Sequence, residues 1–142
     1  MTIDSLDDLI DVRDIIARVE ELRADQDRYL DPEISEDDPG LHADAWADAN
    51  PDKAGELADL TALMIQLENA GGGDIQWEGT WYPDTMIRDS YFTDYARELL
   101  EDCGDLPANL PNYIKIDWEA TTQNIRAGYT PVKFRGVTYW VR

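Results

Sequence analysis

The chain has 142 residues, a length that suits one domain or one domain with an appendage. Hydrophobic residues make up 43% of it and five residues are tryptophan, which excludes a wholly disordered chain because there is enough apolar surface to form a core. The net charge of −19 excludes binding to nucleic acid or to an anionic membrane through the general surface, since affinity for phosphates depends on Lys and Arg.

The first predicted element is a long helix from about Ser5 to about Leu30. Ser5 can cap its start, and Pro32 favours an end before it. At 1.5 Å per residue, the helix is expected to be about 37 Å long. Apolar residues alternate in steps of three and four, which gives a narrow stripe that packs against another helix. These residues are Val12, Ile15, Val19, Leu22 and Tyr29.

The next segment, residues 31–51, is the most acidic of the chain and contains no Lys or Arg. Its Pro32, Pro39 and Gly40 argue against one continuous helix. Two interpretations stay open: a solvated loop that only keeps the protein soluble, or a negative surface that a partner recognises. The candidate partner-binding carboxylates lie in this segment and just before it: Asp25, Asp27, Asp31, Glu33, Glu36, Asp37, Asp38, Asp44 and Asp48.

A second helix is predicted from Asn50-Pro51, a cap followed by proline at the first position, to the glycine run at residues 71–73. It repeats the spacing of three and four residues at Leu57, Leu60, Met64 and Leu67. Two helices with matching apolar stripes predict an antiparallel helical hairpin. The alternative is a first helix that pairs with its own copy in a dimer.

Charge and aromatic content change at the glycine run. Residues 1–71 hold 20 acidic and 5 basic side chains, whereas residues 72–142 hold 11 and 7, together with four of the five tryptophans. This change predicts two units, an acidic helical hairpin over residues 1–71 and an aromatic-rich unit over residues 72–142.

The second half is predicted to be a small α+β unit. Its expected elements, in chain order, are an extended aromatic segment at 77–82, a helix capped by Asp89 or Ser90 and ended by Gly104, a short helix capped by Asp117, and a β-hairpin in which Arg135-Gly136 joins residues 130–134 to 137–141. The predicted fold class of the whole chain is therefore α+β, with the helical hairpin first and a β-hairpin at the end.

The run DYARELLEDCGDLPANLPNYIKIDWEATTQNI, from Asp94 to Ile125, resembles the C-terminal domain of ArdA-type antirestriction proteins. That domain has a similar helix, a connection rich in Gly, Leu and Pro, and a last helix opened by an Asp-aromatic-Glu-Ala sequence. The resemblance covers about residues 88–142, and residues 1–87 do not resemble the other ArdA domains. It implies a phage or plasmid setting and a counter-defence role, since ArdA proteins are acidic dimers that mimic DNA and block type I restriction enzymes.

Residues that commonly carry catalysis are few in this sequence. His42 is the one histidine and is expected at the surface, and Cys103 follows two carboxylates at a predicted helix end. No phosphate-binding loop, serine-hydrolase elbow or zinc-protease motif occurs. We therefore predict no enzymatic activity, no cofactor and no metal site.

Two hypotheses for function follow from the charge pattern. The first is a DNA-mimic inhibitor whose carboxylates meet the basic groove of a DNA-binding defence protein, either a restriction enzyme or a CRISPR effector complex. The second is an interaction or dimerisation module, such as an adaptor or an antitoxin, whose acidity serves solubility. With no targeting or transmembrane segment visible, we expect a cytoplasmic location in an infected or plasmid-bearing bacterial cell, no nucleic-acid or membrane partner, and a possible homodimer.

Overall fold

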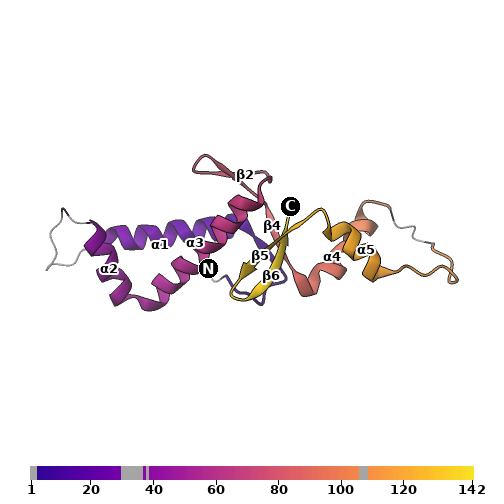
Figure 1. Ribbon diagram of the computed structural model, residues 1–142, viewed down its shortest axis with the longest axis horizontal. Helices are drawn as coiled ribbons and strands as arrows, with labels where there is room; N and C mark the ends of the chain where they lie inside the picture. Colours follow the sequence, from indigo (N-terminus) through magenta and orange to yellow (C-terminus); the bar gives the residue numbers. More distant parts are fainter. Residues whose placement is uncertain (1–2, 30–36, 38, 106–108) are drawn as a thin grey trace.

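An antiparallel sheet of four strands lies near the middle of the elongated molecule, with helices on either side of it (Figure 1). The computed structural model describes residues 3–29, 37, 39–105 and 109–142. The strand order is β1-β4-β6-β5, formed by β1 (Leu9–Asp11), β4 (Thr85–Arg88), β6 (Val137–Val141) and β5 (Thr130–Phe134). The predicted α+β class is therefore confirmed.

The N-terminal helices are α1 (Val12–Arg28), α2 (Pro39–Ala49) and α3 (Pro51–Ala70). α1 and α3 pack against each other, and α2 lies at the end that points away from the sheet (Figure 1). The predicted start of the first helix at Ser5 is wrong. Leu9–Asp11 pair with Thr85–Ile87 as a strand, and the Asp11 side chain caps α1 by accepting from the Arg13 N–H. α1 has 17 residues and is about 26 Å long instead of the expected 37 Å.

Part of the acidic segment is helical. Residues 39–49 form α2, which begins at Pro39, where a missing N–H costs the helix no hydrogen bond. Asn50 separates α2 from α3, and Pro51 starts α3 in the same way. The interpretation of residues 31–51 as one solvated loop is therefore wrong for this part. Residues 30–36 and 38 lie outside the described residues.

The larger hydrophobic core lies between one face of the sheet and the helices α1 and α3. The apolar stripe of α1 is buried there, against Leu60, Met64 and Leu67 of α3 and against strand residues such as Tyr139. The boundary predicted at residues 71–72 thus passes through a shared core, because β1 pairs with β4 and α3 packs on β5. Since one chain already buries this stripe, a dimer through it would require opening the core.

The other face of the sheet carries a smaller, aromatic core. It is covered by the 3₁₀ turn η1 (Asp89–Tyr91) and by the helices α4 (Phe92–Asp102) and α5 (Trp118–Arg126), the latter capped by Asp117 as predicted. Successive strand residues point to opposite faces, so Met86 enters the larger core and Ile87 the smaller one. Phe92 contacts Tyr129 edge to face, with 5.1 Å between ring centroids.

A two-stranded hairpin follows α3 and projects from the side of the molecule (Figure 1). It consists of β2 (Ile75–Trp77) and β3 (Thr80–Tyr82), where the sequence predicted a single extended segment. Glu78 and Gly79 join the strands with φ of 49° and 79°, the positive values that a type I′ turn needs at both positions. Because glutamate rarely adopts positive φ, Glu78-Gly79 does not look like a turn of this type in the sequence.

Candidate functional site: an acidic helical surface

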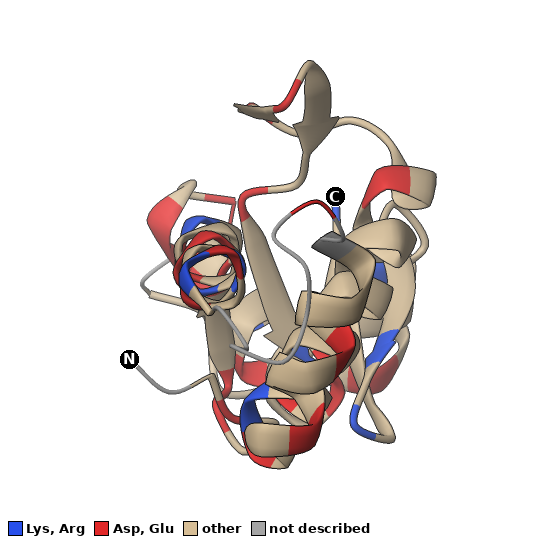
Figure 2. Cartoon of the chain, turned by 90° about the vertical axis from the view of Figure 1, so that its left-hand side faces the viewer, with Lys and Arg blue, Asp and Glu red and all other residues tan. Residues whose placement is uncertain are grey.

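The predicted partner-binding carboxylates that the structure describes lie on α1 and α2 and at Asp37. Figure 2 views the molecule from the end formed by these helices, with Asp and Glu in red. Asp25 and Asp27 lie in the last turns of α1, and Asp44 and Asp48 lie four residues apart on α2. Asp37 is described and exposed. The other four, Asp31, Glu33, Glu36 and Asp38, lie outside the described residues.

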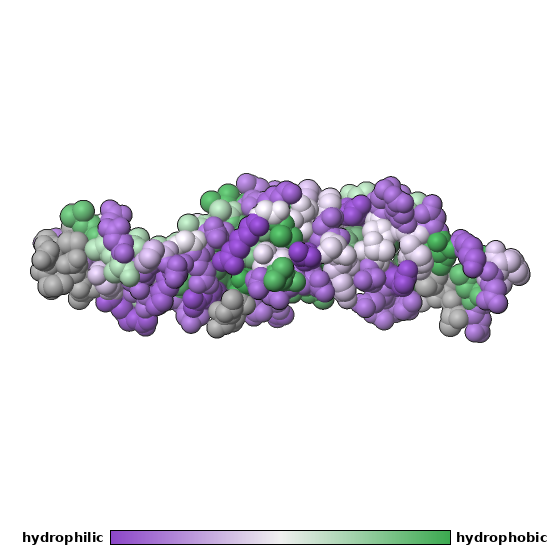
Figure 3. Space-filling model, turned by 90° about the horizontal axis from the view of Figure 1, so that it is seen from below, coloured by the Kyte–Doolittle hydropathy of each residue, from purple (hydrophilic) through white to green (hydrophobic). Residues whose placement is uncertain are grey.

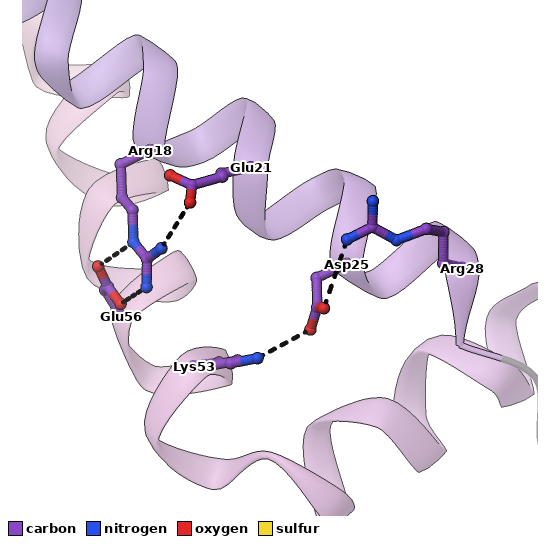
Figure 4. Close-up of polar contacts among 6 residues, drawn as sticks. All are labelled: Arg18, Glu21, Asp25, Arg28, Lys53 and Glu56. Atoms are coloured by element: carbon purple, nitrogen blue, oxygen red, sulfur yellow. Dashed lines mark hydrogen bonds and ion pairs between the residues drawn. The ribbon is translucent and has the colours of Figure 1, made fainter. Parts of the chain in front are cut away.

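The basic side chains of residues 1–71 are all engaged by carboxylates of the same chain. Arg18 makes the tightest pair: its Nε and Nη2 donate to the two carboxylate oxygens of Glu56 at 2.7 and 2.8 Å, and its Nη1 lies 3.5 Å from Glu21 (Figure 4). The other pairs join Arg13 to Asp11, Arg23 to Glu78, Arg28 to Asp25 and Lys53 to Asp25. None of these five cations is left to neutralise the remaining carboxylates.

The Arg18–Glu56 pair links α1 to α3 at partly buried positions, with side-chain exposures of 19% and 20%. The two hydrogen bonds from Arg18 lower the pKa of the Glu56 carboxyl below its ordinary value. The same bonds raise the pKa of the Arg18 guanidinium. The pair therefore stays ionised at neutral pH and fixes the relative position of the two helices.

Asp25 is half-buried, and groups from all three N-terminal helices contact its carboxylate. The Trp46 Nε1–H donates to its carboxylate at 2.9 Å, and Lys53 Nζ lies 3.3 Å and Arg28 Nη2 3.7 Å from it (Figure 4 shows the two cations). The bond from Trp46 is the largest cause of the lowered Asp25 pKa, followed by the bond from Lys53. Asp25 thus fastens α2 and α3 to α1, a structural role that the sequence did not reveal.

Five exposed aspartates of α1, α2 and α3 have no Lys or Arg nitrogen within 4 Å in the part of the chain that the structure describes, and we call them the open carboxylates. Spacing on α2 brings two of them to one side of that helix, because residues four apart are neighbours at about 6 Å. Asp14 and Asp52, in the first turns of α1 and α3, were not among the site residues predicted from the sequence. The open carboxylates are Asp14, Asp27, Asp44, Asp48 and Asp52.

The single histidine lies on α2 and is buried, at 7% exposure, so the expected surface position of His42 is wrong. Its helix places it on the side that packs toward α1 and α3, next to Trp46 at the following turn. Cys103 is exposed at the end of α4. Among the described residues, no three His, Cys, Asp or Glu side chains gather in a way that could hold a metal ion, and no helix is long and apolar enough to cross a membrane.

The Arg18–Glu56 pair is expected to stabilise the fold by about 1 kcal/mol at pH 7 and by much less at pH near 3. Because the folded pKa of Glu56 is depressed, the stabilisation is present above the carboxyl's ordinary pKa of 4.5 and is lost as the pH falls through the lower folded value. A double-mutant cycle with Arg18→Met and Glu56→Gln, followed by urea unfolding at both pH values, measures it.

The exposed Arg13–Asp11 pair serves as the control for that cycle, with side-chain exposures of 73% and 36%. Its coupling is expected to be smaller at neutral pH, because water screens it. An Arg18–Glu56 coupling energy that does not change between the two pH values would contradict the prediction.

Comparison with known proteins identified no match for this chain among protein-family models, curated proteins or solved structures.

Proposed function

We propose that this protein is an acidic inhibitor that occupies the DNA-binding groove of a bacterial defence protein, in the cytoplasm of an infected or plasmid-bearing cell. In this proposal α1 and α3 act as the antiparallel hairpin predicted from the sequence and present α2 at their outer end. The observation that carries it is the division of charge in residues 1–71: the basic side chains are all paired internally, whereas the open carboxylates face solvent.

The physical reason is electrostatic complementarity. A DNA-binding groove presents Lys and Arg at the positions of DNA phosphates, and B-DNA supplies one negative charge per about 1.7 Å of its axis. Carboxylates without internal cations repel one another, a cost that is recovered when a basic partner neutralises them. Association is then expected to be fast and sensitive to salt, because exposed charges attract over roughly 10 Å at 0.1 M ionic strength.

The experiment that tests the proposal is competition with duplex DNA. Purified restriction and CRISPR effector complexes are assayed for DNA binding and cleavage with increasing amounts of this protein. We expect the protein to displace DNA from one such complex, to have no affinity for DNA itself, and to inhibit at least about 10-fold less well when salt rises from about 50 to about 200 mM.

Two outcomes would count against the proposal. The first is simultaneous binding of DNA and this protein to the same complex, and the second is inhibition that does not change with salt. Either would favour the alternative, an interaction module whose acidity serves solubility.

A further inference from the structure

A groove of about 240 Å³ lies between α1, α3 and the β2–β3 hairpin. Its apolar lining comes from buried Val19, Met64 and Tyr82, and from Trp77 of the hairpin. Ile65 also lines it and is 55% exposed. The apolar surface that the groove leaves accessible therefore comes mainly from Ile65 and from half-buried Trp77.

Three contacts between the hairpin and α1 fix the shape of the groove. The Trp77 Nε1–H donates to Glu20 Oε1 at 2.8 Å. Arg23 lies over the Trp77 ring, 5.1 Å from its centroid, and its Nη1 is 3.0 Å from Glu78 Oε1. A groove held in this way is formed before any partner binds, so little ordering free energy is lost on binding.

The charge of the groove is negative. Its lining includes Glu68, Glu78 and the single cation Arg23, which is already paired with Glu78. Glu68 is exposed and has no Lys or Arg nitrogen within 4 Å among the described residues. Burial, and next the charge of Glu68, raise the pKa of the Tyr82 hydroxyl.

We propose that this groove receives an arginine side chain of a basic protein partner. The alkyl stem of arginine packs on apolar surface while its head stays polar, and its planar guanidinium pairs with a carboxylate through two parallel hydrogen bonds. Here the stem lies along the exposed Ile65, and the guanidinium meets Glu68 at the edge of the groove. The inference does not rest on the proposed function, because the arginine need not belong to a DNA-binding groove.

The test uses a blocked peptide, acetyl-Gly-Leu-Arg-Leu-Gly-amide, and its citrulline counterpart, which keeps the shape of arginine without the charge. Both are titrated into the full chain at about 50 mM salt while NMR follows the Met64 and Ile65 methyl groups and the Trp77 indole N–H. We expect saturable shifts at these groups with the arginine peptide and binding at least about 5-fold weaker with the citrulline peptide.

Variants test separately the carboxylate that pairs with the guanidinium and the apolar surface that contacts the stem. Glu68→Gln is expected to weaken the arginine peptide about 3-fold and to leave the citrulline peptide unchanged. Ile65→Ser is expected to weaken both peptides alike, because it removes the surface for the stem. Glu119→Gln, the same change at an exposed position on α5, and the pair Asp44→Asn and Asp48→Asn are expected to change neither.

Equal binding of the two peptides would overturn the proposal, as would shifts that appear on α2 instead of at the groove. A Glu68→Gln variant that binds the arginine peptide as the native chain does would overturn it as well. Retention of peptide binding by a chain that fails to displace DNA would reject the inhibitor proposal and leave this one standing.

Discussion

Reversing Asp27, Asp44 and Asp48 to lysine is expected to abolish displacement of DNA from the target, with binding weakened at least about 100-fold. Each substitution replaces an attraction to the partner's Lys and Arg by a repulsion. The fold is expected to survive, because all three side chains are exposed and make no ion pair among the described residues. Two of them, Asp27 and Asp48, lie near helix C-termini, where a positive charge is favourable.

The matched control reverses three exposed carboxylates at the other end of the molecule, Asp94, Glu101 and Asp102 of α4. It makes the same change in net charge and is expected to reduce binding much less. DNA competition measures the effect, and circular dichroism verifies that both variants are folded. Equal loss in the two variants would mean that only total charge matters, and full activity in both would remove the acidic surface from the mechanism.

Trp46→Ala is expected to be the most destabilising single substitution on α2, costing about 3–5 kcal/mol. Trp46 is 2% exposed, and it fills the space between α2 and the other two helices while its indole N–H donates to Asp25. The substitution therefore leaves a cavity and removes the attachment of α2. Urea unfolding gives the loss of stability, and faster hydrogen exchange at the α2 amides shows where it occurs.

Two further substitutions define the cause of that loss. Trp46→Phe keeps most of the buried ring and removes the hydrogen bond, so its cost is expected to be clearly smaller. Trp81→Ala removes a tryptophan that is 52% exposed on the outer side of β3, and is expected to change stability little. A loss below about 1 kcal/mol for Trp46→Ala would contradict the role assigned to this side chain.

Local signals in the sequence determined much of the helical structure. The apolar spacing from Val12 to Leu22 placed the buried stripe of α1, Asn50-Pro51 marked the start of α3, and Asp117 marked the cap of α5. These signals depend on residues within one or two helical turns of each other, so the helices can be predicted from them without knowledge of the rest of the chain. The division of acidic and basic residues between the two halves was likewise visible in the sequence.

Contacts between distant residues decided the rest. Leu9–Asp11 form a strand because β4 lies beside them. The predicted boundary at residues 71–72 does not separate two cores, because the β1–β4 pairing and the packing of α3 on β5 join the two halves. The tertiary structure also determined which carboxylates are open. In the sequence Asp25 resembles its acidic neighbours, but in the fold it is contacted by Trp46 of α2 and Lys53 of α3. The sequence gives the charge of each side chain directly. Which cation or hydrogen-bond donor contacts that side chain depends on how helices far apart along the chain pack, and a local sequence pattern does not contain this information.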